Sequence, residues 1–141
     1  MRVCAMLARQ RGATTVELAL VLPLLLLVVD GVMEFSMVMY DKVVITNAAR
    51  SAARAGIVLR TPKLDNAAIA ALASTYCASY LLSFDANAVP VVRVIQATPV
   101  GVQTPLQVTV SYTYTSMLLG SLFSAIGQPL TLSSTAVAHH E

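Results

Sequence analysis

Apolar and polar residues follow different periods in successive parts of this chain. From Leu18 to about Tyr40 nearly every side chain is apolar, which predicts a helix long enough to cross a bilayer, since one crossing takes about 20 residues. Beyond this run, apolar side chains recur every three to four residues up to Thr61, and Pro62 then disfavours further helix. We therefore expect one continuous helix with an apolar stripe. The stripe consists of Val43, Val44, Ala48, Ala52 and Ala55, with Arg50 and Arg54 on the other side.

A second, shorter helix is predicted after Thr61-Pro62. Asp65 or Asn66 can cap its first turn, and the alanine-rich sequence that follows favours helix to about Ser83. Four larger apolar side chains recur at helical spacing, and we interpret them as core rather than as a ligand site. They are Ile69, Leu72, Tyr76 and Tyr80.

From Val89 onwards the period changes to two, which is typical of strands. Three segments alternate in this way, 89–96, 106–115 and 130–139, and prolines and glycines separate them. In the first segment, Val92, Val94 and Gln96 lie opposite Val91, Arg93 and Ile95. In the second, the apolar face predicted to pack on the helices consists of Leu106, Val108, Val110, Tyr112 and Tyr114. In the third, the apolar residues are Leu130, Leu132 and Val137.

Two helices followed by three strands predict an α+β fold. One face of a small antiparallel sheet would pack on the helices, and the other face, rich in threonine and serine, would lie in water. Residues 117–126 form an apolar excursion between the second and third strands. The pattern is compatible with a short buried helix or with an exposed contact surface.

A short basic leader precedes the apolar run, and one glutamate lies at its beginning. Arg9, Arg11 and Gly12 come just before Ala13, and Glu17 follows within the first turns of the helix. An ionised carboxylate at the edge of hydrocarbon is costly, so a residue of this kind usually has a partner or a function. The first basic residue after the run is Lys42, which predicts a cytoplasmic N-terminus and an exported remainder.

Three segments in this order resemble the TadE-like family, the pilin-like minor subunits of tight-adherence (Tad or Flp) pilus systems. They are Gly12–Leu25, Gly31–Phe35 and Asn47–Gly56. The resemblance implies a prepilin leader at 1–12, cleaved by a prepilin peptidase between Gly12 and Ala13. It further implies a transmembrane and assembly helix at 13–40 and an exported periplasmic α+β domain at 41–141.

The resemblance also implies roles for residues of the long helix. Glu17 would meet the N-terminal amine of a neighbouring subunit during assembly, and Pro23 would kink the helix. Asp30 and Glu34 lie four residues apart on one helix face, near the outer membrane interface or against another subunit. The implied partners are the peptidase, other pilin subunits, the assembly platform and inner-membrane lipid. Because the chain is much longer than the major pilins of these systems, we expect a minor, initiating or tip subunit that serves adhesion and surface colonisation.

Other interpretations of the N-terminus stay open. The apolar run lacks an A-x-A-like site after it, so a cleavable secretory signal fits poorly. A single-pass anchor for a periplasmic binding module fits the composition but gives Gly12 and Glu17 no role. A pseudopilin of a secretion system would share the leader but not usually the two later segments.

Composition and charge exclude several classes of function. The hydrophobic fraction of 57% and mean hydropathy of +0.73 exceed what a soluble chain needs. Without the leader, six basic residues stand against seven acidic ones, which argues against nucleic-acid binding. The sequence has no phosphate-binding loop and no catalytic motif, so we expect neither an enzyme nor a bound cofactor.

The C-terminal histidines and Cys77 are of residue types that can bind metals or form disulfides, but each has a simpler structural explanation. His139-His140-Glu141 lacks an organised set of metal ligands, and we expect a frayed tail with no metal. Cys77 would have no intrachain partner once Cys4 is removed with the leader. On an alanine-rich helix we expect a buried thiol rather than a bridge between chains.

Overall fold

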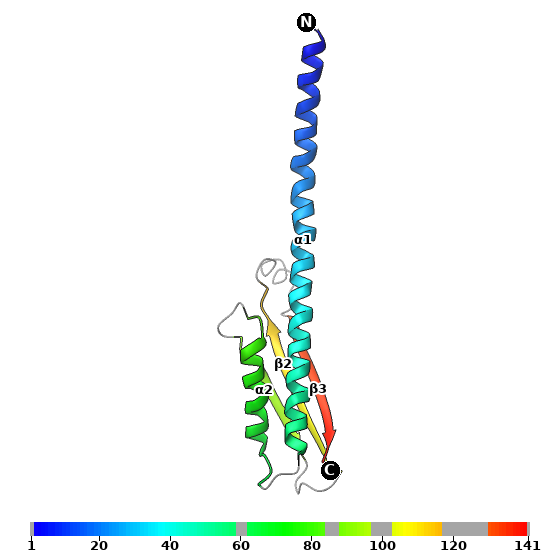
Figure 1. The fold of residues 1–141 in the computed structure, drawn as a ribbon. Coiled ribbons are helices and arrows are strands. Elements are labelled where there is room, and N and C mark those ends of the chain that lie inside the picture. Colours follow the sequence, from blue (N-terminus) through cyan, green and yellow to red (C-terminus); the bar gives the residue numbers. More distant parts are fainter. Residues whose placement is uncertain (1, 59–61, 84–87, 97–102, 117–129, 141) are drawn as a thin grey trace.

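A long helix carries a small sheet domain on its second half. The computed structural model describes residues 2–58, 62–83, 88–96, 103–116 and 130–140, with only the backbone given for residues 2–13. The elements are α1 (Arg2–Ile57), α2 (Asn66–Tyr80), β1 (Val91–Gln96), β2 (Pro105–Tyr114) and β3 (Leu130–His139). Figure 1 shows the N-terminal half of α1 projecting alone, while α2 and the strands lie beside its C-terminal half.

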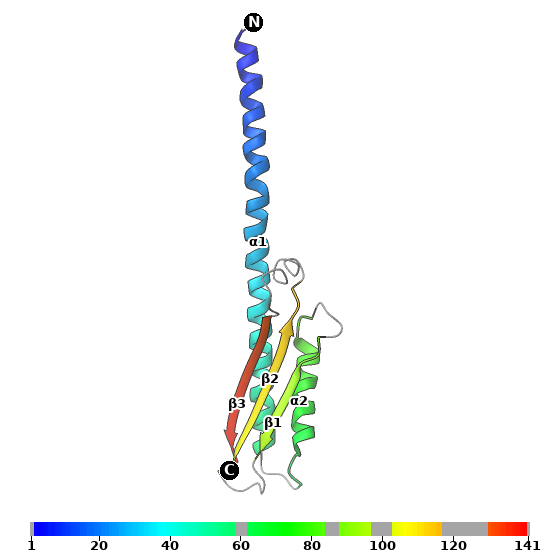
Figure 2. The same ribbon diagram turned by 180° about the vertical axis from the view of Figure 1, so that it is seen from behind.

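The three strands form an antiparallel sheet in the order β1-β2-β3, with β2 in the centre. Val108 of β2 lies opposite Val94 of β1 and Ala136 of β3, which places three small or β-branched side chains on one face. Both helices cover that face (Figure 1), and in the opposite view the strands lie in front of the helices (Figure 2). The predicted α+β architecture is therefore confirmed.

The inward face of β2 supplies the centre of the core, as the alternation predicted. Leu106, Val108, Val110, Tyr112 and Tyr114 are all buried. The first strand begins at Val91 rather than Val89, because Pro90 has no N–H to donate to a ladder. Its half-buried residues are Val92, Val94 and Gln96.

The predicted apolar stripe of α1 is partly wrong. Val43 is 57% exposed, while Ile45 is fully buried together with Ala49 and Ala53. The reason is that α1 contacts β2, β3 and α2 at once, so its buried arc is wide and turned away from Val43. Packing is close at the end of this arc, where a Cβ at Gly56 would overlap the side chains of Leu106 and Ile69.

The predicted stripe of α2 also needs correction. Asp65 caps the helix as expected, since its Oδ1 accepts a hydrogen bond from the backbone N–H of Ala68 at 2.8 Å. Leu72, however, is 46% exposed and Tyr80 is 53% exposed. The buried residues are Ile69, Ala73 and Cys77, because two helices approach closely through small side chains and leave larger ones at the margin. Helix α2 ends at Tyr80 rather than Ser83, since Leu81 is extended.

The third strand has the predicted bounds, and of the three apolar residues that the sequence suggested, Leu132 is buried while Leu130 and Val137 are exposed. Val137 lies opposite Gln107 and is 58% exposed, whereas Leu132 is buried opposite Tyr112. Small residues Ala136 and Ala138 complete the inward face. Residues 117–126, the apolar excursion of the sequence, lie outside the described part of the chain.

The expected frayed tail is also wrong at His140, which is buried. Its backbone N–H donates to the carbonyl of Thr104, and its carbonyl accepts from the N–H of Gln103, so pairing continues beyond β3. Its Nε2 lies 3.1 Å from Nε2 of Gln96. Burial lowers the pKa of His140, and the charge of Lys63 lowers it further. His140 therefore lies at the end of the sheet that is farthest from the projecting half of α1 (Figure 1).

Cys77 is a free, buried cysteine, as predicted. Burial raises the pKa of its thiol, which keeps the sulfur in its unreactive protonated form. The residue thus behaves as a small apolar side chain between the two helices.

Candidate membrane anchor and assembly site

The N-terminal half of α1 is an apolar rod that no described residue of the chain covers. Every side chain from Thr14 to Leu27 is exposed, and most of them are leucine or valine. Among the described residues, one helix is long and apolar enough to span a membrane, by length and composition, and it is this one. An apolar surface of this extent is stable only when lipid or other protein covers it.

The predicted cleavage site lies inside this helix. The backbone of Gly12 and Ala13 is helical, in one unbroken element with the residues that follow. Five positions after Gly12, Glu17 is exposed between Val16 and Leu18. Within the described part of the chain, Glu17 has neither a hydrogen-bonding nor an ionic partner.

The helix continues through Pro23 without a break. Neither view of the molecule shows a sharp bend in the projecting half of α1 (Figures 1 and 2), and a kink at Pro23 stays a prediction. Pro23 removes one backbone donor, the one that would bond to the carbonyl of Ala19. The other backbone hydrogen bonds keep the helix continuous at this position.

Glu34 belongs to the folded domain of its own chain. It is only 4% exposed, and its Oε1 accepts a hydrogen bond of 3.0 Å from the hydroxyl of Tyr114, at the end of β2. Burial raises the pKa of Tyr114, and the nearby carboxylate of Glu34 raises it further. Tyr114 also lies 3.9 Å from the sulfur of Met37. The hydrogen bond between Tyr114 and Glu34 therefore holds the end of β2 against α1.

Asp30 and Glu34, which the sequence placed on one helix face, lie in different environments. Asp30, one turn before Glu34, is half-buried. A contact of either residue with another subunit stays a prediction, but Glu34 has an intrachain partner that already explains its position. The contact with Tyr114 could not be predicted from a local pattern, because 80 residues separate the two.

Asp41 is a buried carboxylate that the sequence analysis missed. It is fully buried, and its Oδ1 accepts a hydrogen bond of 3.0 Å from the backbone N–H of Leu82, just after α2. Its Oδ2 is buried without a hydrogen-bonding partner among the described residues. Burial raises the pKa of Asp41, and the Leu82 N–H opposes this shift. Helical spacing could have revealed it, because Asp41 follows Glu34 and Val38 on the stripe that leads to Ile45.

Lys42 connects α1 to β3. Its ammonium group donates to the backbone carbonyl of Ser133, in the edge strand β3. A lysine that occupies a free carbonyl of an edge strand also discourages pairing with another chain there. Glu34, Asp41 and Lys42 together join α1 to β2, to the segment after α2 and to β3.

The structure brings together no metal-ligating cluster in the part that it describes. No group of three or more histidine, cysteine, aspartate or glutamate side chains converges among those residues. The groups with unusual environments, Glu34, Asp41 and Tyr114, hold elements of the fold together.

Comparison with known proteins agrees with the N-terminal pattern. No curated protein and no solved structure matches the chain. The family model of TadE-like protein matches residues 12–54, which run from Gly12 at the predicted cleavage site to Arg54 in the last turns of α1. This family is associated with Tad pili and is structural rather than catalytic. The predicted resemblance is thereby confirmed over α1: residues 12–54 of this chain are similar to TadE-like proteins.

Proposed function

We propose that this chain is a minor prepilin of a Tad (Flp) type IV pilus, processed after Gly12 by a prepilin peptidase. One observation carries the proposal. The TadE-like match begins at Gly12, and the rod that follows is exposed and apolar with Glu17 as its one charged residue before Asp30. A rod of this kind suits a subunit that first resides in lipid and then packs among other helices.

Cleavage after Gly12 gives Ala13 a free amine close to Glu17. In an apolar bundle, an isolated amine or carboxylate is costly, but the two offset each other when they meet across neighbouring subunits. Ala13, Thr14, Thr15 and Ala19 are small, which lets helices approach closely at this level. Glu17 therefore acts in assembly and not in catalysis.

The proposed topology has a cytoplasmic leader, one crossing of the inner membrane and a periplasmic domain, which later joins the pilus or its base. Arg2, Arg9 and Arg11 support this orientation. Burial of Glu34 by the domain supports an anchor that ends near residue 33 rather than at Tyr40. The shorter anchor still has the ~20 residues that a crossing requires.

The first test is the N-terminus of the mature protein, measured by mass spectrometry on membranes that contain an active prepilin peptidase. We expect the wild-type chain to begin at Ala13. Gly12→Val should leave a full-length precursor, because the peptidase must draw the backbone into a closely held conformation that a β-branched side chain obstructs.

Gly31→Val is the matched control for this test. A Cβ at Gly31 would meet nothing within 4 Å, and the residue lies in the same helix, so this variant should be processed normally. A wild-type chain that still begins at Met1, in cells that process another prepilin, would refute the assignment. Normal processing of Gly12→Val would show that the cleavage site lies elsewhere.

A second measurement addresses the minor role. The folded domain on the C-terminal half of α1 gives each copy far more bulk than a bare helix has. We therefore expect few copies per pilus, at the tip or the base. Quantitative mass spectrometry of sheared pili should find this chain far below the major pilin, and equal amounts would contradict a minor role.

A further inference from the structure

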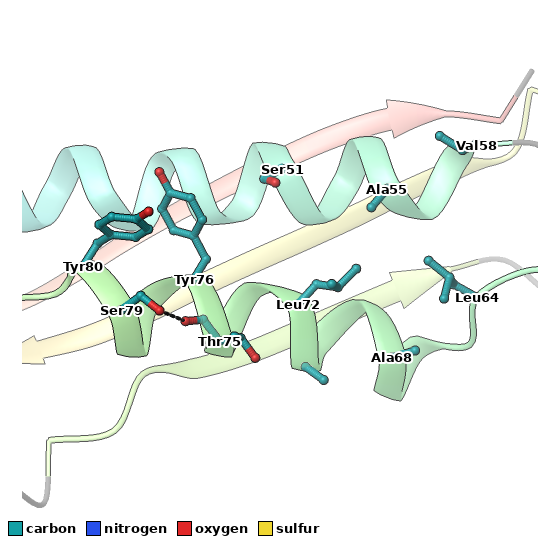
Figure 3. Close-up of a pocket in the computed structure, with 11 residues that line it drawn as sticks. Ser51, Ala55, Val58, Leu64, Ala68, Leu72, Thr75, Tyr76, Ser79 and Tyr80 are labelled. Carbon is teal, nitrogen blue, oxygen red and sulfur yellow. Dashed lines mark hydrogen bonds between the residues drawn. The ribbon is translucent and has the colours of Figure 1, made fainter.

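An open groove runs between α1 and α2 on the outer side of the helical layer. Its volume is about 870 Å³, and it is lined only by the two helices and the residues between them. The lining is mainly apolar. Its principal residues are Ala55, Leu64, Ala68, Leu72, Tyr76 and Tyr80. Figure 3 shows the side chains of Leu72, Tyr76 and Tyr80 projecting from α2 toward α1.

The groove exists because the helices meet through small residues. Ala73 and Cys77 of α2 fill the contact with the core, and the larger side chains remain at the margin, where Leu72 and Tyr80 are exposed. The rings of Tyr76 and Tyr80 lie 4.8 Å apart and tilted at 43°. A contiguous row of exposed apolar side chains is characteristic of a contact surface.

Two arginines form one rim of the groove. Arg50 and Arg54 are exposed and lie one turn apart on α1, and they line a smaller hollow that shares Ser51 and Tyr76 with the groove. No carboxylate lines either hollow. Across the described ranges of the chain, neither arginine has an ion-pair partner. The groove is thus apolar at its base and doubly positive along one side.

We propose that this groove binds an amphipathic helix of a different exported protein, with two carboxylates spaced four residues apart on the side that faces Arg50 and Arg54. The match rests on charge and on spacing. Carboxylates at i and i+4 lie on one face of a helix, as the two arginines do, and each guanidinium can bind a carboxylate through two hydrogen bonds. Apolar side chains of the same helix would lie against Leu72, Tyr76 and Tyr80.

The dimensions of the groove suit a helix of three to four turns. α2, which forms one wall, has 15 residues and is therefore about 22 Å long. An amphipathic segment of this length presents apolar residues at i, i+3 or i+4, and i+7, which is enough to cover the exposed row.

A second copy of this chain does not fit the rim. The sequence has one pair of acidic residues at a spacing of four, Asp30 and Glu34, and Glu34 is buried against Tyr114. The exposed carboxylates Glu17 and Asp65 stand singly. Two copies meeting at this surface would place arginines near arginines, which is unfavourable.

Anionic lipid does not fit the position. Arg50 lies sixteen residues beyond Glu34 in the sequence, which is about 24 Å along α1. The rim is therefore far from the end of the apolar rod, where headgroups would lie. The inference requires only that the domain is exported and does not depend on cleavage after Gly12.

The test uses the full chain in its native cells. A photoreactive amino acid replaces Leu72 in the groove or, as a control, Val137, which is exposed on the outer face of the sheet. Cross-linked peptides are then sequenced by mass spectrometry. We expect Leu72 to capture one peptide that belongs to an amphipathic helix with an acidic pair at i and i+4, and Val137 not to capture it.

Charge reversal makes the test specific. Arg50→Glu should lower the yield of the Leu72 adduct about tenfold, and the double reversal with Arg54→Glu should lower it further, because close interfacial charge pairs contribute strongly to affinity. Arg93→Glu is the matched control, since Arg93 is exposed on the other face of the sheet, and it should leave the yield unchanged. Replacing the two carboxylates of the captured helix by lysine should restore the adduct with the double reversal.

Several results would overturn the proposal. They are an adduct with a second copy of this chain, an adduct with lipid only, a captured peptide without the acidic pair, or equal loss of yield in Arg50→Glu and Arg93→Glu. Absence of any Leu72 adduct would also overturn it, provided that the exported domain resists protease as the wild type does. The mature N-terminus of the same samples reports on prepilin processing independently, so the two proposals can fail separately.

Discussion

The two halves of α1 differ in polarity and in the size of their apolar side chains. Before Glu34 the helix is rich in leucine and valine, and no described part of the chain covers it. After Glu34 the buried positions include four alanines, Ala48, Ala49, Ala52 and Ala53. Large flexible side chains suit a fluid lipid environment, whereas small ones let a sheet and a second helix approach the backbone closely. The size of the apolar side chains therefore distinguishes anchor from domain in addition to hydropathy.

The carboxylates of the two halves differ in the same way. Glu34 and Asp41 each accept a hydrogen bond from their own domain, one from Tyr114 and the other from the N–H of Leu82. Glu17, in the uncovered half, has no such partner among the described residues. A carboxylate in an apolar setting needs compensation, and under the proposed function it comes from the amine of a neighbouring subunit. This difference is what connects the geometry to subunit assembly.

The largest expected effect concerns the uncovered half. Glu17→Ala should leave processing after Gly12 intact and keep the protein in the membrane, because loss of a charge makes an anchor more stable in lipid. It should nearly abolish incorporation into pili, since the amine of a neighbour loses its partner. Glu17→Asp should be intermediate, because the shorter side chain reaches less far. Immunoblots of sheared pili and of membranes measure the two steps separately.

The control for Glu17→Ala is Leu24→Ala, which shortens an exposed side chain of the same rod without changing its charge. It should assemble at close to the wild-type level. Normal piliation with Glu17→Ala would argue for a passive anchor, such as that of a periplasmic binding module, and would remove the distinction drawn between the carboxylates.

A smaller effect tests the rule of side-chain size in the covered half. Ala49 is fully buried, and Ala49→Leu should destabilise the domain by about 1–3 kcal/mol, because added volume in a packed contact forces the elements apart. Val28→Leu, in the exposed rod, should leave stability unchanged within about 0.5 kcal/mol. Hydrogen exchange of the β2 amides in the full-length protein, in detergent micelles, measures both.

Equal protection of β2 in the two variants would contradict this rule. It would mean that the interface between α1 and the sheet adapts to a larger side chain, and that alanine at these positions reflects helix propensity alone.

The sequence predicted elements well where one environment acts on one face. In β2, Val108 and Val110 point inward, because one face of the sheet packs on the helices and the other faces water. The alternation of apolar and polar residues therefore indicates burial directly. Helix α2 was less predictable, because Leu72 was assigned to the core on the ground that it is large and apolar. A helix between two partners buries whichever side fits, and here Cys77 and Ala73 allow the closer approach.

The site was predictable only in its local part. Gly12, Ala13 and Glu17 are recognised by their spacing along one segment, and such a pattern needs no tertiary information. The contact of Glu34 with Tyr114 and that of Asp41 with Leu82 join residues far apart in sequence. They depend on how deeply the sheet overlaps α1, which a pattern of apolar residues does not specify.

The smallest expected effect is a pH dependence that originates in the covered half. Burial raises the pKa of Asp41 in the folded protein, so the folded state holds its proton to a higher pH than the unfolded state does. Stability should therefore be greatest below the unfolded pKa, near 3.8, and should decrease as the pH rises through the folded pKa. Asp41→Asn removes this decrease, because the amide does not titrate and its oxygen can still accept from Leu82. Urea melts of the wild type and the variant from pH 4 to pH 7 should show the variant gaining stability relative to the wild type as the pH rises.

Asp65→Asn provides the matched control, since asparagine caps a helix about as well as aspartate and Asp65 is exposed. The difference in stability between this variant and the wild type should vary less with pH. If the difference in free energy of unfolding between Asp41→Asn and the wild type is the same at every pH, the pKa of Asp41 is not raised in the folded chain. Burial of the Asp41 carboxylate would then not destabilise the fold.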